Sequence, residues 1–225
     1  MNINSDLGEL AGHDDEIIPE VDSANVCCGL HAGSASETIR TARRCRDLGV
    51  EVGAHPGFDD RENFGRTDVR LAPTEIEELV RFQVAALAAV TEIGYIKAHG
   101  ALYHRCQADA EAADAIARVA KEFGVGLMGQ PGFELIAAAN RAGVPALREG
   151  FADRAYLPDG RLAPRSQPGS VLEPEAAAEQ AIRLARSGDF ETICIHGDSP
   201  GAAEVTRSVR RALNEAGIRT APLKH

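Results

Sequence analysis

Stretches with a helical pattern of apolar residues alternate with short apolar runs along most of the chain. At several places the helical stretch ends in glycine and an apolar run begins at once. These junctions are Leu48-Gly49-Val50, Ile93-Gly94-Tyr95, Phe123-Gly124-Val125, Ala142-Gly143-Val144 and Ala216-Gly217-Ile218. Glycine adopts the left-handed conformation that ends a helix, and a continuous apolar run is typical of a buried strand. The pattern predicts a repeated unit in which each helix leads into a strand.

Polar residues and a proline mark the expected helix starts. Ser34 with Glu37, and Thr74 with Glu77, fit the capping box, in which a hydroxyl and a carboxylate bind the first backbone N–H groups. Pro174 suits a first helical turn.

These signals predict alternating strands and helices. Strands are expected near 2–6, 22–27, 50–54, 94–98, 125–129, 145–151, 191–196 and 218–221. Helices are expected near 35–48, 74–90, 109–123, 132–142, 174–187 and 201–216. Such alternation forms right-handed crossovers around a parallel sheet. Seven or eight strands in 225 residues favour a compact α/β barrel, and an open doubly wound sheet is the alternative.

Residues 152–172 interrupt this rhythm. The turn sequence at 158–160 (PDG) is followed by Pro164 and Pro168. We interpret this segment as a hairpin-like insertion or lid.

Composition is that of an ordinary globular protein, with 44% hydrophobic and 26% charged residues. The length suits one β/α-barrel domain over residues 1–225. A formal net charge of −10 and the lack of a Lys/Arg block argue against a nucleic-acid partner. No apolar run approaches the roughly 20 residues that span a bilayer, and the N-terminus lacks the pattern of a secretion signal. We expect a cytoplasmic protein with no membrane partner.

The five cysteines are irregularly spaced, which is typical of reduced thiols. They are Cys27, Cys28, Cys45, Cys106 and Cys194. We interpret them as small buried thiols, with a cysteine nucleophile as the open alternative.

Polar clusters follow the predicted strands. They lie at 4–9 (NSDLGE), 25–33 (NVCCGLHAG), 53–57 (GAHPG), 97–100 (KAHG), 151–154 (FADR) and 196–200 (HGDSP). In a parallel barrel the loops after the strands gather around the axis at one end. The clusters therefore predict one active site at that end.

Four of the seven histidines lie in these clusters. They are His31, His55, His99 and His196. Each alone has a simpler interpretation as a hydrogen-bonded loop or core histidine, but four at four strand ends favour a chemical role. We expect the remaining three at the surface: His13, His104 and His225. The aspartates of these clusters could instead cap helices or form turns, as Asp198 could before Ser199-Pro200.

A metal site is conceivable, because Asp6, His31 and His55 could supply one oxygen and two nitrogen ligands for zinc or another transition metal. We do not favour it, since no HExxH motif is present and the spacing of His99 and His104 does not suit one helical face.

Nucleotide motifs are absent or misplaced. The glycines at 124–129 match G-x-G-x-x-G, but this segment follows a helix and lies inside a predicted strand. No P-loop exists, so any ATP would be bound by helix N-termini together with Lys97 and Arg154. Either cation could instead pair with a nearby carboxylate.

Taken in order, these clusters resemble the LamB/YcsF family, described as the A subunit of a bacterial ATP-dependent 5-oxoprolinase. The matching segments are 4–9 (NSDLGE), 23–33 (SANVCCGLHAG), 53–58 (GAHPGF), 64–66 (FGR), 97–103 (KAHGALY), 151–156 (FADRAY) and 196–200 (HGDSP). The family usually has Cys in place of Ser5 and Pro in place of Ala98, and the connections before Tyr95 and Thr192 are shorter here. The resemblance implies a seven-stranded, TIM-like β/α barrel related to glycoside hydrolase and deacetylase barrels.

The resemblance also implies an activity, which is cleavage of 5-oxo-L-proline to L-glutamate with hydrolysis of ATP, carried with Mg²⁺, to ADP and phosphate. The B and C subunits of the 5-oxoprolinase are the implied partners, and no other bound metal is expected. Phosphorylation of the lactam oxygen would create a leaving group and an electrophilic C5 that water can attack.

Our hypothesis assigns roles to the cluster residues. Lys97 and Arg154 would stabilise phosphate charge. Water would be oriented and deprotonated by a carboxylate and an imidazole from one set: Asp6, Glu9, His31, His55 and His99. Substrate or nucleotide would be held by a second set: Asn25, Asp153, Arg154, His196 and Asp198.

Two other functions stay open. One is a metal-dependent deacetylase or carbohydrate hydrolase that uses Asp6, His31 and His55 as ligands. The other is a non-catalytic lactam-binding subunit whose partners perform the chemistry.

Overall fold

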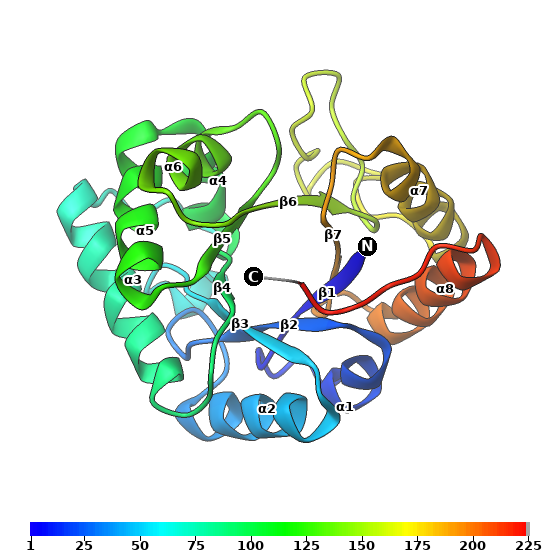
Figure 1. The fold of residues 1–225 in the computed structure, drawn as a ribbon, viewed down its shortest axis with the longest axis horizontal. Helices are drawn as coiled ribbons and strands as arrows, with labels where there is room; N and C mark the ends of the chain where they lie inside the picture. The colour runs from blue at the N-terminus through cyan, green and yellow to red at the C-terminus, as the bar shows by residue number, and fades with distance from the viewer. Residues whose placement is uncertain (224–225) are drawn as a thin grey trace.

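Seven parallel strands close into a barrel in the computed structural model of the chain, which describes residues 1–223 (Figure 1). The strands are β1 (Asn2–Leu7), β2 (Ser23–Cys27), β3 (Glu51–His55), β4 (Tyr95–Ile96), β5 (Gly126–Gly129), β6 (Ala146–Phe151) and β7 (Thr192–His196). Each strand pairs with the next in the chain, and β7 pairs with β1. The predicted seven-stranded β/α barrel is therefore confirmed, and the open sheet is excluded.

Helices surround the barrel on its outside (Figure 1). They are α1 (Asp14–Ile17), α2 (Ala35–Leu48), α3 (Pro73–Ala88), α4 (Gly100–Ala108), α5 (Ala110–Phe123), α6 (Glu134–Ala142), α7 (Pro174–Ser187) and α8 (Ala202–Glu215), with 3-10 turns η1 (Ile18–Glu20) and η2 (Arg61–Asn63). The apolar core lies between these helices and the outer face of the strands, where residues such as Ile3, Val26 and Ile193 are fully buried. No helix of residues 1–223 is both long and apolar enough to cross a membrane.

Helix ends follow the sequence signals in most places. Gly49, Gly124 and Gly143 end helices in the left-handed conformation, and the Ser34 hydroxyl accepts a hydrogen bond from the N–H of Glu37 at 3.1 Å. Pro174 opens α7 as expected.

Two expected signals around α3 are wrong. The helix begins at Pro73, where Glu75 accepts from the N–H of Ala72 at 2.7 Å, so Thr74 is not its cap. The helix also ends well before Gly94, whose N–H instead bonds Val52 in the barrel wall at 2.9 Å. Helix α4 was not expected at all, because its start overlaps a polar cluster and its apolar periodicity is weak.

The expected strand at 218–221 is also wrong. This segment runs back across the barrel end as coil (Figure 1), and the Ala221 N–H donates to the carbonyl of Met1 at 3.0 Å. Pairing of β7 with β1 closes the sheet, so no edge remains for an eighth strand.

Three histidines were expected at the surface. His225 lies outside the described residues, whereas His13 is half-buried and His104 is exposed.

Residues 152–172 form the expected hairpin-like insertion between β6 and α7. Isolated antiparallel bridges join Arg154 to Val171 and Tyr156 to Leu162. The Tyr156 hydroxyl accepts from the N–H of Phe151 at 2.7 Å, which ties the insertion to the end of β6.

The barrel interior is polar. Along β1, Asn2, Asn4 and Asp6 alternate with apolar or small residues, so that they share one face of the strand. Asn4 donates to the Thr192 hydroxyl at 2.7 Å. Asn25 donates to Asn4 at 2.7 Å and accepts from the hydroxyl of Tyr95 at 2.7 Å. This hydrogen-bonded interior continues to the carboxyl ends of the strands, where the polar loops gather.

Lys97 carries a fully buried ammonium group inside this network. Its Nζ lies 3.2 Å from Asp6 and 3.0 Å from Glu149, and it donates to Asn4 at 3.2 Å and to the sulfur of Cys194 at 2.9 Å. Lys97 follows β4, and its contacts belong to β1, β6 and β7. One side chain therefore links both sides of the barrel through its interior.

Gly53 leaves the space that Tyr95 fills, because a Cβ at Gly53 would lie 2.1 Å from the Tyr95 ring. We expect Gly53→Ala to lower the free energy of unfolding by about 1–3 kcal/mol, as overpacked cores do. Urea denaturation would measure this loss. The cost should shrink in a Tyr95→Leu background if the clash is its cause. An equal cost in both backgrounds would contradict the explanation.

Replacement of the buried Lys97 ammonium group should destabilise the fold, because it leaves the carboxylates of Asp6 and Glu149 without their cation. We expect Lys97→Met to lower the free energy of unfolding by about 3–5 kcal/mol, measured by urea denaturation near neutral pH. Lys121 is exposed, so Lys121→Met is the matched control and should stay within about 0.5 kcal/mol of the parent. Similar losses in the two variants would show that burial of the Lys97 charge is not the cause.

Candidate active site

The polar loops line one cavity of about 710 Å³ at the carboxyl ends of the strands. Its wall includes the ends of β1, β3 and β7, Arg66, the segment from Lys97 through α4, Gln130 and Phe133 after β5, and the insertion after β6. Of the residues that sequence analysis singled out, six line this cavity: Asp6, His55, Lys97, His99, Arg154 and His196. The others lie behind these or beside the opening.

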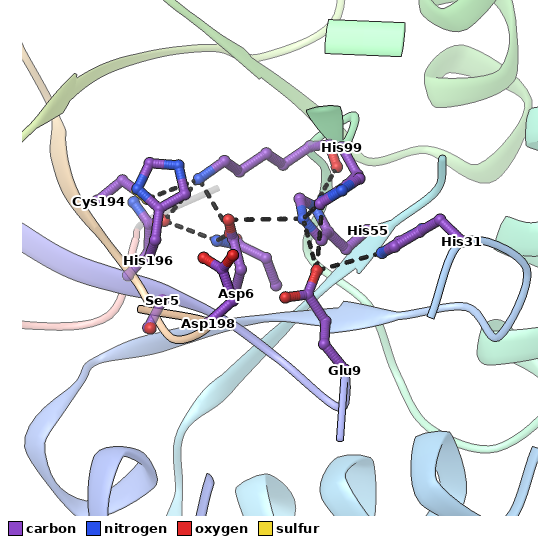
Figure 2. A network of polar contacts seen from close by, with 12 residues as sticks. Ser5, Asp6, Glu9, His31, His55, His99, Cys194, His196 and Asp198 are labelled. Atoms are coloured by element: carbon purple, nitrogen blue, oxygen red, sulfur yellow. Dashed lines mark hydrogen bonds and ion pairs between the residues drawn. The ribbon is translucent and has the colours of Figure 1, made fainter. Parts of the chain in front are cut away.

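Glu9, His31, His55 and His99 form one compact group, here called the histidine cluster (Figure 2). Glu9 Oε1 lies 3.2 Å from His31 Nε2, 3.7 Å from His55 Nε2 and 3.2 Å from His99 Nδ1. The rings of His31 and His99 stack in parallel with their centroids 3.9 Å apart. Glu9, His31 and His99 follow β1, β2 and β4, and His55 is the last residue of β3.

Two glycines permit this packing. A Cβ at Gly57 would lie 2.5 Å from His31 Nδ1, and one at Gly65 would lie 2.8 Å from the His31 side chain. The glycines of the segments GAHPGF and FGR therefore have a steric role beside the histidines.

Backbone carbonyls orient two of the rings. His55 Nδ1 lies 2.8 Å from the carbonyl of Lys97, and His99 Nε2 lies 2.8 Å from the carbonyl of Phe64. A carbonyl only accepts, so both of these nitrogens carry hydrogen. The other nitrogens, His55 Nε2 and His99 Nδ1, face each other at 3.0 Å.

Burial lowers the pKa values of the histidines in this cluster, whereas the Glu9 carboxylate raises them. Burial lowers the pKa of His55 to about 3 and also lowers the pKa of His31. Burial opposes the charge of His99 as well, but the hydrogen bond and charge of Glu9, the charge of Asp6 and the carbonyl of Phe64 together raise the pKa of His99. The pKa of Glu9 is lowered, because contacts with His31 and His99 exceed the cost of burial. Among the three histidines of the cluster, His99 is therefore the one whose surroundings favour the protonated form.

Asp6 sits between the histidine cluster and Lys97. Its Oδ2 is 3.6 Å from His55 Nε2, and Asn25 donates to its Oδ1 at 2.8 Å. Burial alone would raise the pKa of Asp6, but the Lys97 ammonium and His55 hold it well below the usual range. Glu149, by contrast, has a raised pKa because burial outweighs its contact with Lys97. Asn25, which was expected to bind ligand, does not line the cavity and instead positions Asp6.

Asp153 and His196 form a carboxylate–imidazole pair. His196 Nδ1 lies 3.0 Å from Asp153 Oδ2, and the backbone N–H of His196 donates to the same carboxylate at 3.1 Å. His196 Nε2 has no hydrogen-bond partner within residues 1–223, and the side chain lines the cavity. The ring also stacks on Phe151, with centroids 5.5 Å apart. Asp153 and Phe151 thus fix the orientation of the His196 ring in the wall of the cavity.

Arginines gather beside the opening. Arg66 and Arg165 both pair with Asp198, the latter at 3.1 Å, so Asp198 holds guanidinium groups rather than facing the cavity. Arg154 donates to the carbonyls of Ala163 and Ser170 and thereby holds the insertion closed on itself. Burial lowers the pKa of Arg154, but its ordinary value is so high that the charge persists.

Sequence reasoning missed several residues of this site. They are Asn4, Arg66, Tyr103, His104, Glu149, Arg165 and Cys194. Asn4, Glu149 and Cys194 could have been found from polar residues recurring at every second position of buried strands. Arg66 and Arg165 lie far from each other in sequence, and no local signal joins them. His104 lines the cavity from α4, the helix that the sequence did not reveal.

Two groups of side chains within residues 1–223 bring metal-ligating atoms within 4.8 Å of one another. One is the histidine cluster, and the other comprises Asp6, Cys194 and His196. The ligand set considered from sequence therefore differs from the geometry, because Glu9 and His99 join the two histidines and Asp6 contacts Lys97. All five cysteines are free, as expected. In the glycine motif at 124–129, Gly124 ends α5 and Gly126–Gly129 form β5 of the barrel wall, so the motif is no phosphate loop.

Known proteins with a similar sequence include the A subunit of 5-oxoprolinase from Thermus thermophilus, which is 42% identical with 97% of each chain covered. The corresponding protein of Chloroflexus aurantiacus is 43% identical, and the match covers 97% of this chain and 96% of that one. The crystal structure of a lactam utilization protein from Thermus thermophilus superimposes with a TM-score of 0.92 at 40% identity, covering 99% of both chains.

A more distant likeness concerns the fold alone. A family 4 carbohydrate esterase from Streptomyces lividans superimposes with a TM-score of 0.58 at 10% identity, over 100% of this chain and 92% of the esterase. The model of the LamB/YcsF family, in contrast, matches residues 1–225. With this match and relatives about 40% identical over nearly the whole length, the chain belongs to the LamB/YcsF family.

Proposed function

We propose that this chain is the A subunit of a 5-oxoprolinase, which opens the lactam ring of 5-oxo-L-proline to L-glutamate while ATP is hydrolysed to ADP and phosphate. The observation that carries the proposal is one cavity that combines an oriented imidazole, a buried ammonium group and nearby guanidinium groups. The names of the relatives and of the superimposed lactam utilization protein support the substrate class.

Activation of the lactam accounts for the need for ATP. A five-membered lactam is a stable amide, and transfer of a phosphoryl group to its oxygen would make C5 electrophilic. The charge that develops on the phosphoryl oxygens calls for fixed cations. Arg154 and Arg165 line the cavity and match phosphate or the substrate carboxylate through paired N–H groups. ATP and its Mg²⁺ would supply the phosphoryl group and part of the charge neutralisation.

His196 is the best candidate for the base that activates water. Its side chain lines the cavity, its Nε2 has no protein partner among residues 1–223, and Asp153 fixes the ring through Nδ1. A carboxylate in this position stabilises the imidazolium that forms when the ring takes a proton. His55 and His99 also line the cavity, but their inner nitrogens contact each other. Lys97 would stabilise the oxygen of the reacting group from the cavity floor.

The relatives are named as one lettered subunit of an enzyme, which supports assembly with further chains. We propose that the B and C subunits of the 5-oxoprolinase are the partners of this chain, and that the complex works in the cytoplasm, where the five free thiols would stay reduced.

A second function, metal-dependent hydrolysis of an amide or ester, is favoured by one specific observation. Three imidazoles and a carboxylate converge within the same barrel end. Such an enzyme would act without ATP.

The purified chain should release glutamate from 5-oxo-L-proline in step with ADP formation when the B and C subunits are present. His196→Asn keeps an amide that can donate to Asp153 but removes the imidazole base, so we expect kcat to fall by about 100-fold to 10,000-fold. Steady-state measurement of glutamate and ADP would check this.

His13→Asn is the control, since His13 lies at the start of α1, outside the residues that line the cavity, and should leave kcat unchanged. Unchanged turnover in His196→Asn would remove His196 from the base role. Lactam binding without turnover in every combination of chains would favour a non-catalytic binding role, and hydrolysis without ATP would favour the metal-dependent function.

A further inference from the structure

The four donor atoms of the histidine cluster are arranged like the ligands of a metal ion. Glu9 Oε1 lies 3.2, 3.7 and 3.2 Å from the inner nitrogens of His31, His55 and His99, and the last two are 3.0 Å apart. A tetrahedral shell with metal–ligand distances of roughly 2.0–2.1 Å has edges of roughly 3.3–3.4 Å. The observed separations bracket this value.

The orientation of the rings requires a cation between them. His55 and His99 each direct an N–H at a backbone carbonyl, so their inner nitrogens carry lone pairs when the rings are neutral. These lone pairs face each other and the Glu9 carboxylate at hydrogen-bonding distance. Three electron-rich atoms in contact repel one another unless a proton or a metal ion lies among them.

The surroundings of the rings match those of metal ligands in proteins. Histidine ligands commonly donate their other ring N–H to a carbonyl or carboxylate, which fixes the tautomer and the ring direction. The carbonyls of Lys97 and Phe64 do this for His55 and His99 at 2.8 Å each. The Nδ1 of His31 is buried without a partner in the described chain, so its tautomer is not committed and Nε2 is available as a lone pair.

The donor set selects the kind of ion. Three imidazoles and one carboxylate suit Zn²⁺ and similar divalent transition metals, whereas Mg²⁺ and Ca²⁺ prefer oxygen ligands. His55 and His99 line the cavity, which gives an ion a route from solvent.

The second group of metal-ligating atoms is less suitable. Lys97 Nζ lies 3.2 Å from Asp6 and 2.9 Å from Cys194, so an ammonium group already occupies the place of a cation there. His196 in that group directs Nδ1 at Asp153.

We propose that the histidine cluster binds one divalent transition-metal ion of the Zn²⁺ class through Glu9 Oε1, His31 Nε2, His55 Nε2 and His99 Nδ1. The four ligands come from the carboxyl ends of four successive strands, β1 to β4, so the ion holds these ends together at the cavity floor. This inference does not depend on the lactam or on ATP.

The test is metal binding by the purified, chelator-stripped full chain. We expect calorimetry to show one Zn²⁺ per chain and thermal unfolding to move to higher temperature when Zn²⁺ is added. Glu9→Gln and His99→Gln should each weaken binding by about 100-fold or more, beyond the range of changes that only reorient a ligand. His104→Gln alters a histidine of the same cavity outside the cluster and should bind like the parent.

Loss of binding in His196→Gln with retention in Glu9→Gln would move the ion to the group with Cys194 and overturn the proposal. Failure of the parent chain to bind Zn²⁺ would also overturn it, and the cluster would then hold a proton.

X-ray absorption of the Zn²⁺-loaded parent chain tests the ligands without any variant that could misfold. We expect three imidazoles and one oxygen at roughly 2.0–2.1 Å from the ion. A sulfur ligand at roughly 2.3 Å, or fewer than three imidazoles, would contradict the assigned site.

Discussion

The buried ammonium group of Lys97 is the contact on which the arrangement of the barrel end depends. It touches Asp6, Glu149 and Cys194, which belong to three different strands, through the interior of the barrel. A charge in this position is tolerated only with carboxylates and hydrogen-bond acceptors around it, because burial without them costs several kcal/mol. The network thereby holds the strand ends that carry the site in one relation to each other.

A polar interior has consequences for packing. Most parallel barrels fill their centre with branched apolar side chains, whereas here asparagines, a tyrosine and charged groups satisfy one another in layers. Each of these side chains must keep its hydrogen bonds, because a buried polar group without a partner destabilises the fold. Asp6 and Lys97 extend this polar network into the lining of the cavity.

Three functional groupings divide the barrel end between them. The histidine cluster occupies the carboxyl ends of β1 to β4, and the Asp153–His196 pair joins β6 to β7. The insertion and its arginines close the wall between these parts. In a parallel barrel the fold sets the end at which a site lies, whereas the residues of the loops set its chemistry.

The sequence by itself determined the alternation of strands and helices, the barrel, the insertion and the end of the barrel at which polar residues gather. These follow from local periodicity, glycine and proline signals, and family motifs such as GAHPGF. Tertiary structure decided that β7 pairs with β1, which excludes an eighth strand. It also decided which polar residues belong to the histidine cluster and which contact Lys97. Glu9 contacts His99, whereas Asp6 contacts Lys97. The sequence does not reveal these contacts, because distances between side chains of different loops depend on the curvature of the barrel and on glycines that allow close packing.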